Sequence, residues 1–301
     1  MDVAIRVDVD THRGLGEGVP RLSELLRDEQ VTASFFIAMG PDNSGRAVVR
    51  AFRNRGFLAK MMRTRAVSTY GLRTILSGTL LPARQMALAF PGLVAGLVSD
   101  GFEVGVHGYD HVRWQDQIDS LGDDQIEAEI DDAFEVYRAV LGSPPASFAA
   151  PGWRTSQRAL LALEKRGLSY RSDTRGRTPY RCAVGGAVLA TPEIPTTLPT
   201  LDEVMGRRAM NGPSAVVDFF KAQFAEERLN VHTIHAEVEG MGQLETFRAL
   251  LAALKERRAR FFRLDEVARR LQGEKLPICE VTRTTVLGRG GWVSAQGAEC
   301  Q

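Results

Sequence analysis

The regular alternation of short β-type runs with helical stretches constrains this fold most. Runs such as VAIRVDV, ASFFIAM and FEVGV are each followed by a segment of helical character, and the alternation continues as far as ARFFRL. Strands that alternate with helices in this way predict a parallel α/β sheet or barrel. In either arrangement, functional residues are expected on the loops that follow the carboxyl ends of the strands.

Composition excludes several classes of protein. The chain has 301 residues, of which 44% are hydrophobic and 25% charged, which is ordinary for a folded globular protein. Its formal net charge is only +1, so nothing in the total demands a polyanionic partner such as nucleic acid. The three cysteines (Cys182, Cys279 and Cys300) lack the spacing of metal ligands and argue against a disulfide framework.

The distribution of apolar residues predicts a cytoplasmic protein. The segment MDVAIRVDVD lacks the basic start and apolar core of a secretory signal. The longest nearly unbroken apolar run, from Met86 to Val98, contains a proline and falls short of the roughly 18 residues that a spanning helix needs. We therefore expect no transmembrane helix.

Residues 43–99 differ from the rest of the chain in charge. They include nine basic residues and no Asp or Glu, interleaved with apolar runs such as FLAKMM and ILSGTLL. This composition suits amphipathic helices on an anionic membrane surface, although a solvated helical insertion paired with acids elsewhere has the same composition. We expect residues 1–274 to form a single domain that includes this insertion, and residues 275–301 to form an irregular tail.

The motif HGYDH follows the apolar run FEVGV and places His107 and His111 four residues apart. This spacing puts both imidazoles on one face of a helix turn, as in helical metal sites, but an HxxxH pair also arises by chance on solvated helices. Its position after a predicted strand, in a chain with only five histidines, favours a pair of metal ligands.

The first predicted strand ends in DVD, with Asp8 and Asp10. Residues two apart point to the same side of a strand, so the two carboxylates repel each other unless a cation or a shared proton lies between them. A metal ion bound by Asp10 and the two histidines would supply that cation and leave positions open for water and substrate. Capping of loop N–H groups is the alternative role for these aspartates.

The late motif NVHTIHAEVEG contains two histidines on one predicted strand. His232 and His235 are three apart and so face opposite ways; we expect His235, nearer the carboxyl end, to enter the site. Glu237 and Glu239 follow on the same side if the strand continues, as candidate substrate contacts or as solvated loop residues.

These motifs, taken in order, resemble one family. DVD, HxxxH, APGWR, SDTRG and TIHAEVEG are similar to the five motifs of the polysaccharide deacetylase (NodB-homology) family, and the likeness runs from the first strand to about Leu264. The resemblance implies a distorted (β/α) barrel of about seven parallel strands with a basic helical insertion. It also implies an enzyme that hydrolyses the C–N bond of a non-peptide amide.

The resemblance assigns roles to five of these residues. Asp10, His107 and His111 match the metal ligands, Asp8 matches the general base and His235 matches the general acid. A divalent metal ion is therefore implied. Zinc, cobalt, manganese, nickel and iron all suit such a site, and the residues do not identify which.

The resemblance also implies roles for three further residues, and at some positions this sequence differs from the family pattern. Asp173 of SDTRG matches the carboxylate that orients the acid, and the region of Trp153 should give the substrate an apolar wall and a backbone N–H. Arg154 is expected beside Asp8, because Ala149 and Ala150 stand where the family usually has an arginine. Val112 replaces a histidine that often follows the HxxxH motif.

Within the family, the likeness is greatest to members that remove the formyl group from 4-deoxy-4-formamido-L-arabinose carried on undecaprenyl phosphate, in lipid A modification. The resemblance thus implies a lipid-linked amino sugar as substrate and a peripheral position on the anionic cytoplasmic side of the inner membrane. The arginines of residues 43–99, together with Arg13, are expected to bind the phosphodiester of this substrate. An N-deacetylase of another amino sugar and an inactive binder of lipid-linked sugar are the alternatives.

Overall fold

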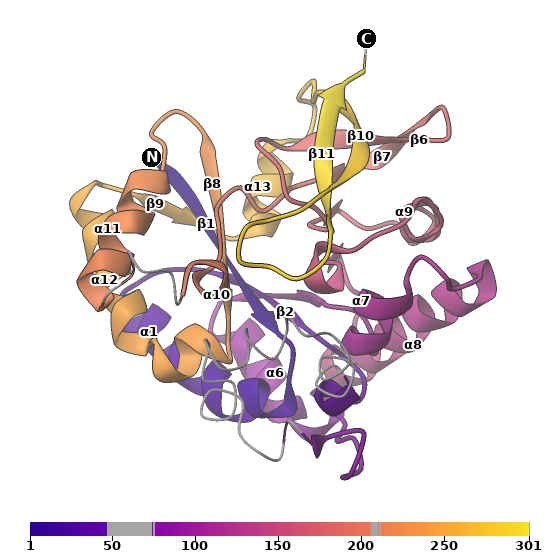
Figure 1. Cartoon of the computed structure of the whole chain (residues 1–301), viewed down its shortest axis with the longest axis horizontal. Helices are drawn as coiled ribbons and strands as arrows, with labels where there is room; N and C mark the ends of the chain where they lie inside the picture. The colour runs from indigo at the N-terminus through magenta and orange to yellow at the C-terminus, as the bar shows by residue number, and fades with distance from the viewer. Residues whose placement is uncertain (47–73, 75, 206–209, 211, 301) are drawn as a thin grey trace.

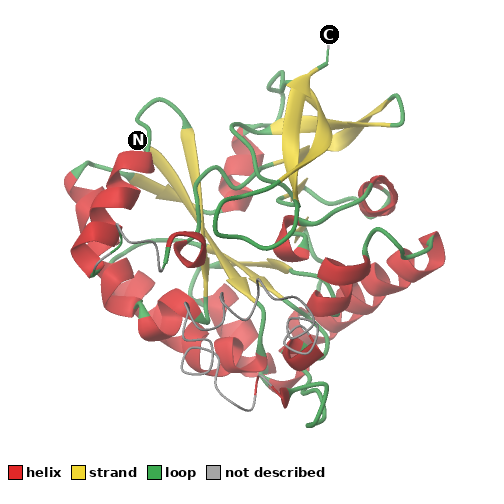
Figure 2. Ribbon diagram, viewed as in Figure 1, coloured by secondary structure: helices red, strands yellow, loops and turns green. Residues whose placement is uncertain are grey.

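The computed structural model describes residues 1–46, 74, 76–205, 210 and 212–300 (Figure 1). Strands and helices alternate through most of this chain (Figure 2). The strands are β1 (Asp2–Val9), β2 (Ser34–Ile37), β3 (Glu103–Val106), β4 (Ser147–Phe148), β5 (Tyr170–Arg171), β6 (Tyr180–Val184), β7 (Ala187–Glu193), β8 (Leu229–His235), β9 (Arg260–Phe262), β10 (Ile278–Thr284) and β11 (Val293–Glu299).

The helices lie outside the curved sheet, with α1, α11 and α12 on one flank and α7 and α8 on the other (Figure 1). The α-helices are α1 (Val19–Asp28), α6 (Pro91–Ser99), α7 (His111–Gln117), α8 (Asp123–Leu141), α9 (Gln157–Glu164), α10 (Leu201–Val204), α11 (Pro213–Gln223), α12 (Leu244–Glu256) and α13 (Leu264–Arg270). Four short helical segments of other types carry the label η. Two are π-helical, η1 (Gly14–Gly18) and η4 (Val238–Gly242), and two are 3₁₀ turns, η2 (Ala87–Ala89) and η3 (Pro151–Trp153).

Parallel strands form the centre of the fold in the order β7-β5-β4-β3-β2-β1-β8, while β9 pairs with the start of β1. The chain that leaves β7 returns to the opposite edge, where the N–H of Thr197 donates to the carbonyl of Val231 on β8 at 3.1 Å. The sheet therefore curls towards a barrel without a continuous closing ladder. The predicted α/β fold with about seven parallel strands is confirmed.

The two faces of β1 explain how the strand positions the site. Val3, Ile5 and Val7 pack into the main hydrophobic core with residues of the surrounding helices. The alternate residues face the other way: Ala4 packs in a second cluster with Phe36 and Leu264 of other elements. Because side chains alternate along a strand, Arg6 and Asp8 share the inner face with Ala4.

The outer helices cover the core with one apolar face each, on which buried residues recur at helical spacing. On α12, the buried residues Phe247, Leu250, Leu251 and Leu254 recur at the three- and four-residue spacing of one helix face. The long helix α8 begins with Asp123 and Asp124 and ends before a left-handed glycine, so its ends carry the groups that helix termini favour. The strand ends are thereby held on a rigid scaffold.

The expectation of an irregular tail after residue 274 is wrong. The strands β10 and β11 form an antiparallel hairpin, and β10 extends the sheet by pairing with β6. Cys279 of β10 is buried and packs in a cluster with Tyr180, Cys182 and Leu189. The segment therefore gains backbone pairing and a small core of its own, although its sequence has no clear period.

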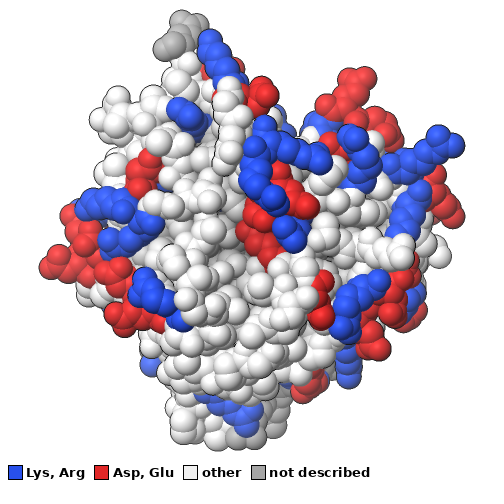
Figure 3. Space-filling model, turned by 180° about the vertical axis from the view of Figure 1, so that it is seen from behind, with Lys and Arg blue, Asp and Glu red and all other residues white. Residues whose placement is uncertain are grey.

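Most of the basic segment lies outside the described residues; of its nine basic positions, only Arg46 and Arg84 are described. On the back of the molecule, basic and acidic side chains lie next to one another, beside broad areas that carry neither (Figure 3). None of the described helices is both long enough and apolar enough to cross a bilayer.

Candidate active site

The inner face of β1 carries a buried ion pair. The guanidinium of Arg6 donates to both carboxylate oxygens of Asp8, at 2.6 and 2.7 Å, and also to the backbone carbonyl of Ser172. Burial raises the pKa of Asp8, but the charges of Arg6 and His107 outweigh it, so the pKa lies below its usual value. Asp8 is thus held ionised inside the barrel.

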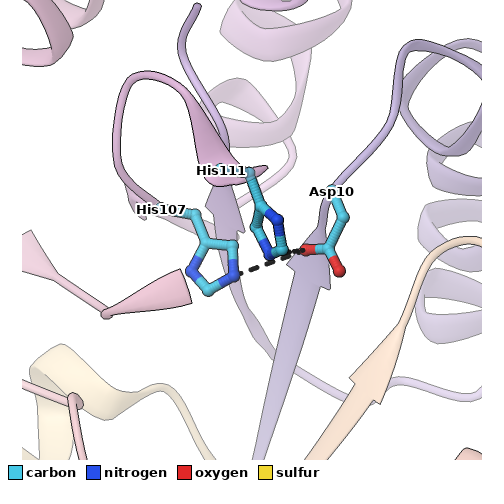
Figure 4. Close-up of side chains that lie close together, drawn as sticks. All are labelled: Asp10, His107 and His111. Atoms are coloured by element: carbon cyan, nitrogen blue, oxygen red, sulfur yellow. Dashed lines mark ion pairs between the residues drawn. The ribbon is translucent and has the colours of Figure 1, made fainter. Parts of the chain in front are cut away.

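Asp10 follows β1 and meets the two histidines of HGYDH (Figure 4). The Nε2 atoms of His107 and His111 lie 3.3 and 3.4 Å from Oδ1 of Asp10. The ligand atoms of the three residues all lie within 4.8 Å of one another. The expectation that one carboxylate and two imidazoles gather at the strand ends is confirmed.

The two histidines reach this position from a loop, not from one helix face as their spacing suggested. His107 comes directly after β3, Gly108 turns the chain with a φ of +77°, and His111 begins α7. Asp110 caps that helix by accepting from the N–H groups of Val112 and Arg113. Glycine favours this turn because residues with a side chain rarely adopt a backbone conformation with positive φ.

The three residues fit a metal ion on two observations. The Nδ1 atom of His107 donates to the carbonyl of Ala149 at 2.8 Å, which leaves the lone pair of Nε2 directed at Asp10. Among the described residues, nothing donates a hydrogen bond to the buried Oδ1 of Asp10. Burial also lowers the pKa of His111, and neutral imidazole is the form that binds metals.

His235 lies at the end of β8, in register with Asp8 on the neighbouring strand. Burial lowers its pKa, but the carboxylates of Asp202, Asp10 and Asp8 outweigh burial and raise the pKa to about 8. His232, by contrast, is buried against Phe220 and its pKa falls to about 3. The expectation that the two histidines differ, and that His235 is the one near the aspartates, agrees with this geometry.

The ring of Trp153 is almost fully buried and forms a wall beside His235. The two ring centroids are 6.2 Å apart, edge to face, and the indole N–H donates to Oγ1 of Thr196 at 2.9 Å. The backbone N–H of Trp153 donates to the carbonyl of Ala150. The ring is therefore placed as an apolar surface, while its own backbone N–H is already engaged.

Asp173 does not take the place expected beside His235. Its carboxylate accepts from the N–H of Ala150, and burial together with Glu193 raises its pKa well above the usual value. The carboxylate near Nδ1 of His235 is Asp202 of α10, at 3.8 Å. A sequence signal existed, since Thr200 and Glu203 form a capping box that places Asp202 in the first turn of a helix.

Arg154 is likewise found elsewhere, because Arg6 already occupies the space beside Asp8. The Arg154 guanidinium donates to the carbonyls of Gln115 and Trp292 and lies over the Trp292 ring. Sequence reasoning missed Arg6, although its position two residues before Asp8 puts it on the same strand face.

The two glutamates that were expected to contact substrate accept hydrogen bonds from the backbone of the site. The Oε1 atom of Glu237 accepts from the N–H groups of Asp10 and Thr11, and Glu239 accepts from the N–H of His235. Both glutamates are buried, because β8 ends at His235 and the chain then turns into η4. Arg13 pairs with Glu17 one helical turn away, and its contact with substrate stays a prediction.

A curled parallel sheet with one carboxylate and two imidazoles at its strand ends is what the resemblance to the polysaccharide deacetylases implies. The chain belongs to that family, whose sequence profile matches residues 3–171. A probable polysaccharide deacetylase from Pseudomonas aeruginosa shares the fold, with a TM-score of 0.61 and 16% identity over 90% of this chain and 91% of that one.

Two relatives resemble the chain over nearly its whole length. A probable 4-deoxy-4-formamido-L-arabinose-phosphoundecaprenol deformylase from Shewanella sediminis is 35% identical, covering 98% of this chain and 95% of its own. A protein of the same name from Wigglesworthia glossinidia brevipalpis is 32% identical, covering 93% and 96%. Family and relatives together make this chain an amide-hydrolysing enzyme.

Proposed function

We propose that the chain removes the formyl group from 4-deoxy-4-formamido-L-arabinose linked to undecaprenyl phosphate. The observation that carries the proposal is the pairing of Asp8 and His235 on adjacent strands beside the group of Asp10, His107 and His111. One side chain favours its ionised form and the other its protonated form. The full-length similarity to two deformylases supports this substrate.

Asp10, His107 and His111 would hold a divalent metal ion. Such an ion, when bound, polarises a carbonyl oxygen and lowers the pKa of a water molecule. Two imidazoles and one carboxylate accommodate zinc, cobalt, manganese, nickel or iron, so the identity of the ion is left to metal analysis.

Asp8 and His235 divide the proton transfers between them. Asp8, held ionised by Arg6, receives a proton from the water that attacks the formyl carbon. His235 delivers its proton to the amide nitrogen as the C–N bond breaks, because an amine anion is a very poor leaving group. Formate and the free amino sugar are the products, and Trp153 screens the donor from one side.

The lipid carrier places the reaction at a membrane surface. We propose a peripheral position on the cytoplasmic side of the inner membrane, with the basic residues 43–99 against anionic headgroups. Vesicle sedimentation tests this: binding should favour anionic over neutral vesicles and weaken when Arg50, Arg53 and Lys60 are neutralised. Equal binding in all cases would count against the membrane role of this segment.

The decisive experiment measures formate release by the purified, metal-analysed protein on the lipid-linked formamido sugar. The N-acetyl form of the same substrate is the comparison. Release of formate with little acetate supports the deformylase, and the reverse supports an N-deacetylase. Binding without release of either acid supports an inactive lipid-linked-sugar binder.

A further inference from the structure

The loop between β10 and β11 reaches from the hairpin towards the centre of the molecule (Figure 1). Two of its glycines, Gly288 and Gly291, have φ values of +92° and +80°. A Cβ at Gly288 would lie 2.0 Å from the carbonyl oxygen of Glu203, and one at Gly291 would lie 2.3 Å from Nη2 of Arg154. The loop is thus packed closely against α10 and against the chain that follows η3.

This packing brings Arg289 to the edge of the site. Its guanidinium carbon lies 4.4 Å from the ring centroid of Trp153, the same ring that packs edge to face with His235. One guanidinium nitrogen is 3.5 Å from Oε1 of Glu203, and the side chain keeps 12% of its surface exposed. Arg289 and the proposed acid His235 therefore contact the same aromatic ring, and part of the Arg289 side chain faces solvent.

Arg289 belongs to a group in which cations outnumber acids. We define the arginine cluster as Arg154, Arg175, Arg283 and Arg289. Glu203 is engaged mainly by Arg175, at 2.8 Å, and Asp119 pairs with Arg283 at 2.5 Å. Among the described residues, the four arginines of the cluster therefore form ion pairs with only two carboxylates, those of Glu203 and Asp119.

The excess charge has a measurable electrostatic consequence. Burial, together with the charges of Arg289 and Arg283, lowers the pKa of Arg154. Like charges held together in a partly buried site raise the free energy of the protein unless an anion joins them. Planar guanidinium groups match phosphate oxygens in geometry and bind them through charge-assisted hydrogen bonds.

We propose that Arg289, supported by Arg154, binds the phosphodiester of the substrate and so selects sugars that carry a phosphate. This inference rests on the proposed function. In a pyranose ring the carbon that bears the glycosyl phosphate lies opposite the carbon that bears the formamide. A formamide placed beside His235 therefore needs its phosphate subsite one sugar ring away. Arg289 is the member of the arginine cluster whose guanidinium carbon lies nearest the Trp153 ring, at 4.4 Å from its centroid, and that ring contacts His235.

The test compares Arg289→Ala with wild type on two substrates in lipid-free detergent: the formamido sugar on a short prenyl phosphate, and its methyl glycoside without phosphate. Loss of one charge-assisted contact should raise KM for the phosphate substrate by roughly 10- to 100-fold with little change in kcat. Activity on the methyl glycoside should be equal in both proteins. Arg289→Lys should recover part of the difference.

Arg269→Ala is the matched control, because it also removes one arginine charge but from an exposed position on α13. An equal loss on both substrates, or no loss on either, would overturn the inference. A defect that appears only when anionic vesicles are added would assign Arg289 to a lipid headgroup and would also overturn it. If wild type hydrolyses neither substrate, the failure lies in the proposed function itself.

Discussion

The two sides of the site handle charge in opposite ways. On the metal side, Arg6 neutralises Asp8, and Asp10 faces two imidazoles. In the arginine cluster, cations exceed the carboxylates that pair with them. The metal side therefore leaves the carboxylate of Asp10 for a bound cation, whereas the arginine cluster leaves positive charge for an anionic ligand. In the roles proposed above, chemistry and substrate binding are divided between two electrostatic environments.

The sharpest way to break this comparison is to remove the proton-transfer groups. Asp8→Ala and His235→Ala should each lower kcat by at least about 100-fold, because positioned general acids and bases contribute on that scale. Metal content, measured by elemental analysis, should stay near that of wild type. Substantial turnover in either purified variant would remove Asp8 or His235 from its assigned role.

The buried pair of Arg6 and Asp8 should dominate the stability difference between the two sides. Arg6→Ala leaves Asp8 charged and unpaired inside the barrel, which should cost about 3–5 kcal/mol of unfolding free energy. Urea denaturation measures this loss. Arg289→Ala is the comparison and should cost less unfolding free energy than Arg6→Ala, since Glu203 keeps Arg175 as its main partner and repulsion within the arginine cluster is relieved. Similar losses in both variants would contradict the contrast.

Glu237 holds the backbone that carries Asp10, and the affinity of the protein for metal tests this role. Glu237→Ala removes the acceptor for the N–H groups of Asp10 and Thr11 and should weaken metal binding by about 10- to 100-fold, as loss of supporting groups commonly does. A competition titration with a chelating dye gives the affinity. Glu237→Gln, which keeps an acceptor oxygen, should bind metal more tightly than the alanine variant.

The smallest expected effect concerns the protonation of His235. NMR titration of the metal-free protein should give this imidazole a pKa of about 8, held up by Asp202, Asp10 and Asp8 against the effect of burial. Asp202→Asn should lower it towards the ordinary value of roughly 6.5. The pKa of His235 is higher in the folded protein than in the unfolded chain, so its protonation stabilises the fold. This contribution to the free energy of unfolding is complete below the unfolded pKa and disappears as pH rises through about 8. An unchanged pKa in the variant would remove Asp202 as a partner.

The sequence predicted the parts of the molecule that depend on local pattern. Strand and helix alternation indicated the barrel, and the strand-end positions of Asp10, His107 and His111 indicated the metal group. The partners of Asp8 and His235 were less accessible: Arg6 could have been found from strand alternation, whereas Asp202 depends on where α10 packs. Tertiary packing, not local sequence, decides such contacts.

The hairpin of β10 and β11 escaped sequence analysis for a similar reason. Its strands are only partly apolar, and they are held by pairing with each other and with β6. The position of Arg289 follows from that pairing and from two glycines in left-handed conformation. Neither feature has a periodic signal in the sequence.

The placement of Arg289 in the last hairpin of the chain also bears on how the site assembles. The metal group draws on β1, β3 and the start of α7, while the position of Arg289 depends on the pairing of β10 with β6. Contacts between distant parts of a chain form slowly because they require closure of long loops. The chain between Asp10 and His107 is as long as the chain between Cys182 of β6 and Cys279 of β10. During refolding, metal binding and selective turnover of the phosphorylated substrate should therefore return together.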